Sequence, residues 1–160
     1  MAFEFYVTVN DTKKSFSGES DRAAYKGKIP GSFFSCGVVS PRDATTGQAT
    51  GKRRHEPIVM RKKVGLMSPL FIKALTSNEV LPTVVFEFVH TSTDGKEEIF
   101  YKITLSNATV SSHKMVLPET TGDSTHIELT EEICFTFQKI EWNHVKGRKV
   151  TTDDWTSQDN

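Results

Sequence analysis

The sequence of 160 residues, with 36% hydrophobic and 25% charged residues, has the length and composition of a single globular domain. Its twenty lysines and arginines balance its twenty aspartates and glutamates, which argues against a dedicated nucleic-acid binder. No apolar stretch approaches the roughly 20 residues that a membrane span needs, and the opening residues lack the basic segment of a secretory signal peptide.

Residue usage favours β-structure. Val, Ile and Thr together supply 41 residues, and the 11 Phe outnumber the 7 Leu. Apolar and strand-forming stretches predict strands, in chain order, at 3–9, 32–40, 55–64, 83–90, 97–105, 108–116 and 131–145. Asp94-Gly95 separates two of these stretches and predicts a hairpin turn. The expected fold is mainly β, an antiparallel β-barrel that is closed or nearly closed.

One segment predicts a short α-helix over about residues 69–78 that flanks the barrel. Ser68 is the expected N-cap, and Pro69 suits the first helical position because its missing N–H costs nothing there. Phe71 and Ala74 then fall on one helix face, which should pack on the barrel.

Two stretches lack periodicity, at about 40–54 and at 118–125. The first, rich in Thr, Gly and charge, predicts a long extended loop, and loops of this length are usually functional or disordered. Residues 1–155 are expected to form one domain, and residues 156–160 a polar tail.

The last long strand changes phase. Ile133, Phe135 and Phe137 share one parity, whereas Ile140 and Trp142 share the other. A strand with one buried face keeps its parity, so we expect a β-bulge or sharp bend near residues 138–139.

The sequence presents no catalytic, cofactor-binding or metal-ligating constellation. Residues 47–53 resemble a phosphate loop only superficially, because the glycine spacing is one residue short and Arg53 replaces the hydroxyl residue. The five histidines and two cysteines lack metal-ligand spacing. Cys36 and Cys134 stand in apolar company, which predicts packed rather than reactive thiols.

Charge is unevenly distributed along the neutral chain. Residues 52–63 contain six basic residues and only one acidic residue, and acidic residues outnumber basic ones from Glu119 onward. The basic run is compatible with a solvated strand edge, with head-to-tail self-association through the acidic end, or with nucleic-acid binding. The absence of interleaved aromatic residues weakens the last alternative.

Taken together, these motifs resemble the haemolysin-coregulated protein family, the inner-tube proteins of bacterial type VI secretion systems. The resemblance spans residues 2–155 and is carried by Gly18-Glu19-Ser20, Phe34-Ser35-Cys36-Gly37, Thr50-Gly51-Lys52-Arg53 with His55 and Pro57, Ser68-Pro69-Leu70, Asn107-Ala108, Phe135-x-Phe137-x-Lys139-Ile140-x-Trp142 and Asp153-Asp154-Trp155.

The resemblance implies a non-enzymatic structural protein. It implies homo-hexameric rings that stack into a tube, a contractile sheath around the tube, a spike protein at its tip and secreted effectors in the ring lumen. It further implies synthesis in the bacterial cytoplasm and export without a signal peptide, with no cofactor, nucleic acid or membrane insertion. Ser35 is the candidate lumen residue, and the candidate residues for ring stacking are Gly47, Gly51, Lys52, Arg53 and Arg54.

Two other classes remain open from the residues alone. A monomeric β-barrel could bind a small ligand in its interior, although the Phe-rich strands favour a filled core. A secreted enzyme or toxin would need an acid–base or nucleophile constellation, which the sequence does not present.

Overall fold

The computed structural model describes residues 3–11, 18, 20, 25–119, 121–122 and 127–155, so the predicted polar tail at 156–160 lies outside the described residues, as does part of the aperiodic stretch at 118–125. The described elements are β1 (Glu4–Asn10), β2 (Ile29–Gly31), β3 (Phe33–Ser35), β4 (Val38–Val39), β5 (Arg54–His55), β6 (Ile58–Lys63), α1 (Ser68–Thr76), β7 (Leu81–Thr91), β8 (Glu97–Val116), β9 (Thr130–Thr136), β10 (Lys139–His144) and β11 (Lys149–Asp154).

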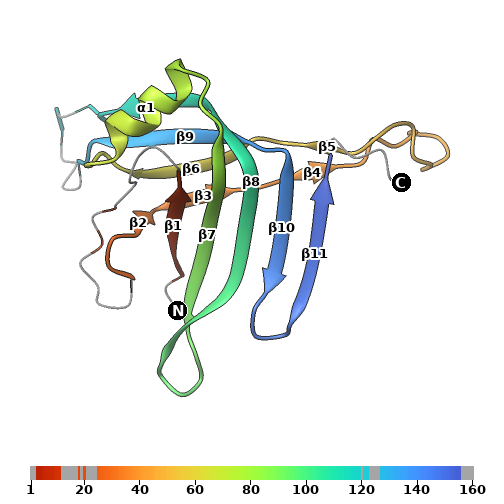
Figure 1. Cartoon of the computed structure of the whole chain (residues 1–160). Helices are drawn as coiled ribbons and strands as arrows, with labels where there is room; N and C mark the ends of the chain where they lie inside the picture. The colour runs from red at the N-terminus through yellow and green to blue at the C-terminus, as the bar shows by residue number, and fades with distance from the viewer. Residues whose placement is uncertain are drawn as a thin grey trace.

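Nine strands form one antiparallel sheet that curls around a core (Figure 1). Its main path runs β2-β1-β7-β8-β9-β6-β3, and β10 and β11 extend from β8 beside that path. Strands β4 and β5 form a separate two-stranded sheet. The predicted class is confirmed: the protein is mainly β and antiparallel, with one short helix.

The sheet curls as a barrel does, but the two ends of its described part do not pair; we call this curled sheet the barrel. Among the described strands, no ladder joins β2 to β3, the two ends of the main path. These strands are consecutive in the chain and separated by Ser32, whose N–H donates to the carbonyl of Arg61 in β6 (2.8 Å). The break at Ser32 leaves β2 paired with β1 and β3 paired with β6, so the chain itself links the two ends of an open sheet.

Apolar side chains fill the space inside the curled sheet. Val7, Phe86, Leu105 and Phe135 are completely buried there. Helix α1 covers one end of this core (Figure 1) and inserts Phe71, whose ring lies edge-on to that of Phe135 at 6.1 Å. The helix is thus stabilised by packing, since nine residues are too few for a stable isolated helix.

The start of α1 corrects one prediction. The N-cap is Met67, and Ser68 is the first helical residue. The Ser68 hydroxyl accepts a hydrogen bond from the N–H of Gly65 (2.9 Å) and donates to Glu131 (2.7 Å), so it ties the helix to β9 instead of capping it.

The strand predictions for the second half of the chain hold in part. The hairpin at Asp94-Gly95 is confirmed, with Gly95 at a φ of 79°. The predicted bend is confirmed as well, since β9 ends at Thr136 and β10 begins at Lys139. The two strands predicted at 97–105 and 108–116 are one strand, β8, which pairs with β10 before Asn107 and with β9 after it. Strand β11 was not predicted.

Candidate functional site: a projecting arm and its base

Residues 38–55, which we call the arm, project from the side of the barrel as a hairpin (Figure 1). Strands β4 and β5 pair Val38 with His55 and Val39 with Arg54. Further out, Arg42 and Ala49 form an isolated bridge, and the N–H of Thr50 donates to the carbonyl of Pro41 (3.0 Å). The loop expected at 40–54 is extended as predicted, but it is an ordered hairpin because its backbone groups pair across the arm.

A carboxylate organises the tip of the arm. One oxygen of Asp43 accepts hydrogen bonds from the hydroxyl of Thr45 (2.5 Å) and from the N–H groups of Thr45 (2.7 Å) and Thr46 (3.0 Å). These bonds lower the pKa of Asp43 to about 2. Gly47 has a φ of 72°, which suits glycine, whereas Gly51 needs no such freedom and has open space around it. The turn thus depends on Asp43 and Gly47.

The three predicted stacking cations of the arm have different surroundings. Lys52 and Arg54 are exposed. Arg53 is half-buried, because its Nε donates to Asp153 Oδ2 (2.6 Å) and its Nη2 donates to the carbonyl of Asp154 (3.0 Å). Strand alternation explains the difference, since Arg53 lies on the opposite face from its two neighbours. Lys52 and Arg54 are therefore the cations that a partner could reach.

The base of the arm sits against an aromatic group from the end of the chain. The imidazole of His55 is 2% exposed and lies 2.6 Å from the same Asp153 oxygen that binds Arg53. The rings of Phe137, Trp142 and Trp155 surround it at centroid distances of 5.2, 6.1 and 5.4 Å. Sequence reasoning missed Asp153 as a partner, because nearly one hundred residues separate it from His55 and no spacing rule connects them.

Ser35 ends strand β3, and Cys36 follows it in the segment that leads into the arm. Ser35 is exposed and lies on the face opposite Phe34, whose ring packs in the core. Burial raises the pKa of the Cys36 thiol, although a hydrogen bond with Trp142 works in the opposite direction. A raised pKa is that of a packed thiol rather than of a reactive thiolate.

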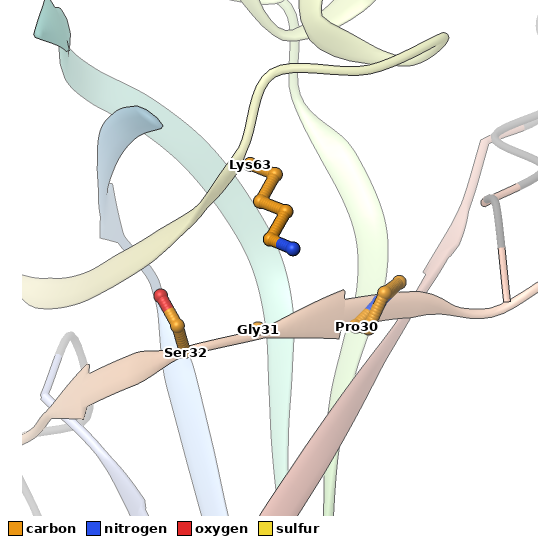
Figure 2. A pocket seen from close by; sticks show the side chains of 4 residues that line it. All are labelled: Pro30, Gly31, Ser32 and Lys63. Atoms are coloured by element: carbon orange, nitrogen blue, oxygen red, sulfur yellow. The ribbon is translucent and has the colours of Figure 1, made fainter. Parts of the chain in front are cut away.

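A small surface cavity of about 220 Å³ lies at the break between β2 and β3. Figure 2 shows Lys63 reaching from the end of β6 toward Pro30 and Gly31 of β2 and the adjoining Ser32. The Lys63 amine already pairs with Glu128 at 2.9 Å. The cavity is smaller than the ~300 Å³ at which ligand pockets typically begin.

A solvated strand edge, one of the alternatives for the basic run at 52–63, does not hold at Lys62. Lys62 is not solvated: its side chain is 1% exposed and pairs with the fully buried Glu131 at 2.7 Å. Arg61 pairs with Glu132 at 2.8 Å.

Within the described residues, no group of His, Cys, Asp or Glu side chains is arranged to hold a metal ion. No helix of the same residues is long and apolar enough to cross a membrane.

The comparisons with known proteins agree over nearly the whole chain. Residues 6–144 match the family described as type VI secretion system effector, Hcp. The Major exported protein of Pseudomonas aeruginosa is 30% identical over 168 aligned positions, which cover 98% of each chain.

Solved structures give the same answer. A crystal structure of an Hcp protein superposes with a TM-score of 0.88 at 25% identity, covering 96% of this chain and 98% of that one. The secreted protein Hcp3 of P. aeruginosa superposes with a TM-score of 0.79, also at 25% identity, covering 98% of this chain and all of that one. The family is one of structural, secreted proteins and not of enzymes. This chain therefore belongs to the Hcp family of type VI secretion proteins.

Proposed function

We propose that this chain is the ring-forming subunit of a type VI secretion tube. Six copies close a ring, and the rings stack into a tube that a contractile sheath surrounds and a spike protein tips. The subunit is made in the bacterial cytoplasm and leaves the cell through the type VI system itself. Family membership supports this function, and the balanced charge of the chain permits self-association.

The observation that carries the stacking part of the proposal is the arm. It projects from the barrel as an ordered hairpin (Figure 1), so it can reach a neighbouring subunit without first paying the entropy of ordering a loop. Its outer face presents Lys52 and Arg54. We infer that these two cations meet carboxylates of the adjacent ring.

Ser35 is our candidate for the ring lumen. Its side chain is exposed on the outward face of β3, with the core on the other face of the same strand. A small hydroxyl at such a position leaves room for an effector in the lumen.

The alternative of a monomeric barrel with an interior ligand has less support. Buried side chains fill the inside of the curled sheet. Nucleic-acid binding is disfavoured too, because Arg53, Arg61 and Lys63 of the basic run each pair with a carboxylate of this chain.

The test reverses the charge of the two exposed arm cations. Purified wild-type protein should sediment as a ring of about six times 17.9 kDa and form tubes at low salt. The double variant Lys52→Glu/Arg54→Glu should keep the ring and its thermal stability but form much shorter tubes by electron microscopy. Each exposed contact contributes at most ~1 kcal/mol, but several copies per ring face act together.

The matched control is Lys52→Arg/Arg54→Lys, which keeps the charge at both positions and should keep the tubes. Tubes of unchanged length in the charge-reversed variant would contradict the stacking role of the arm. A monomer at all protein concentrations would contradict the ring.

A further inference from the structure

The base of the arm is held to the barrel by a cluster that we call the latch, made of Arg53, His55 and Asp153. One oxygen of Asp153 lies 2.6 Å from both Arg53 Nε and His55 Nε2. A second Arg53 nitrogen donates to the carbonyl of Asp154 at 3.0 Å. His55 of β5 and Arg53, the residue before β5, are thus bound at one point, the end of β11.

Strand alternation determines which side chains of the arm enter the latch. In β5 and the residue before it, Arg53 and His55 point to one face of the hairpin, and Arg54 points to the other. The latch therefore takes the two inward side chains and leaves Arg54 exposed. It fixes which face of the arm turns toward the barrel and which face a partner would meet.

The carboxylate of the latch is itself held by the sheet. Asp153 is paired with Ile140 of β10, which is completely buried. Next to it, the indole N–H of Trp155 donates to the carbonyl of Phe137 (2.5 Å), and the N–H of Trp155 donates to the carbonyl of Gln138 (3.3 Å). The end of β11 is thus tied to the bend between β9 and β10, and it offers Arg53 and His55 an anchor that belongs to the barrel.

Besides the latch, the described contacts at the base of the arm include the rings of Phe137, Trp142 and Trp155 around His55. The backbone there is held by the two-residue ladder of β4 and β5 and by the hydrogen bond from the N–H of Glu56 to the carbonyl of Gly37 (2.9 Å). Such a short ladder is marginal by itself. The latch is buried enough to be strong, since the side chain of His55 is 2% exposed and that of Asp153 is 23% exposed.

We propose that Asp153 is the positioning residue of the arm: it binds Arg53 and His55 together and so holds the hairpin in one direction relative to the barrel. Arg53 then belongs to the anchor rather than to the contact surface for a neighbouring ring. The importance of that direction for tubes rests on the proposed function, but the anchoring itself does not.

Hydrogen–deuterium exchange of the full-length protein tests the anchoring directly. In Asp153→Asn, peptides that cover residues 38–56 should exchange about tenfold faster or more, because hydrogen bonds to charged groups are among the stronger ones and the base loses its anchor. Peptides from β7 should exchange as in the wild type. Asp94→Asn, which removes the same charge from the β7–β8 turn, is the control and should leave the arm unchanged.

Arg53→Gln keeps the Asp153–His55 contact and should give a smaller acceleration in the same peptides, so it carries the test if Asp153→Asn does not fold. Arm exchange equal to wild type in Asp153→Asn would overturn the proposal, and so would an acceleration that is equally large in β7, because that would show a general loss of structure. Neither result depends on tubes. Failure of the Lys52/Arg54 experiment would thus contradict the stacking function and leave the latch in place.

Discussion

Two adjacent lysines of β6 form ion pairs of nearly equal length in opposite environments. Lys62 lies 2.7 Å from Glu131, with side-chain exposures of 1% and 0%. Lys63 lies 2.9 Å from Glu128, with exposures of 69% and 52%. Breaking a buried pair leaves an uncompensated charge in a medium of low polarity, whereas water replaces an exposed partner at little cost.

The two lysines therefore make a matched pair of variants. Lys62→Met should lower the free energy of unfolding by about 3–5 kcal/mol, because among the described residues Glu131 then keeps Ser68 and His113 alone as side-chain partners. Lys63→Met should change it by about 1 kcal/mol or less. Urea titration at one fixed protein concentration measures both. Similar losses in the two variants would show that burial does not decide the energetics of these pairs.

The burial of Lys62 could have been anticipated, but its partners could not. Ile58, Met60 and Lys62 share the parity of the inward face of β6, so alternation alone places Lys62 inside. A solvated edge was one of three alternatives for the basic run, and none of them took this alternation into account. The positions of Glu131, Ser68 and His113 near Lys62 depend on how β8, β9 and α1 pack together. The sequence carries no spacing signal for this packing.

At the scale of elements, the close pairing of β2 with β1 depends on a glycine, Gly31, that faces a ring. A Cβ on Gly31 would lie 2.1 Å from the ring of Phe5. That ring is 7% exposed and is held between Phe34 and Phe88 at centroid distances of 5.8 and 5.7 Å. The ring therefore has little freedom to move away.

Gly31→Ala should accordingly destabilise the protein by about 1–3 kcal/mol through overpacking. Gly51→Ala is the control, because its Cβ would meet no atom within 4 Å and its φ is not positive. The control should be neutral or up to about 1 kcal/mol more stable, since alanine restricts the unfolded chain. Equal stability of the two variants in urea titration would contradict the close packing of Gly31 against Phe5.

The elements were predictable wherever apolar and polar residues alternate along a strand. The phase change between Phe137 and Ile140 revealed the bend, because a strand buried on one face cannot change parity without one. Strand β8 was predicted as two strands, at 97–105 and 108–116. In the structure Asn107 adopts a φ of 51° and the strand continues. Strand β11 is largely exposed, so it has no apolar alternation to reveal it.

At the scale of the whole molecule, carboxylates with lowered pKa values are spread over separate regions. The hydrogen bond from Arg53 lowers the pKa of Asp153 at the latch, against the effect of burial. Burial by itself would raise the pKa of Glu131, but hydrogen bonds from Lys62, Ser68 and His113 outweigh it and lower that pKa below its ordinary value of 4.5. Hydrogen bonds from His90 and Lys146 lower the pKa of Glu98 beside the β7–β8 hairpin.

Acid should therefore destabilise the fold in a defined window. A carboxylate whose pKa is lower in the folded state contributes stability above its ordinary pKa, and this stability is lost as the pH falls through the folded value. The melting temperature should change little between pH 7 and pH 5 and should fall progressively below about pH 4.5, the ordinary pKa of Glu131. The chain is neutral at pH 7, so protonation of its acids also leaves a growing positive charge that repels itself.

In Asp153→Asn the acid-induced fall in melting temperature should be shallower, because one of the carboxylates whose protonation destabilises the fold is absent. Thermal unfolding followed by circular dichroism from pH 7 to pH 3 measures both slopes. A melting temperature that stays constant down to pH 3, or the same slope in wild type and variant, would show that these carboxylates do not contribute to folding as their contacts indicate.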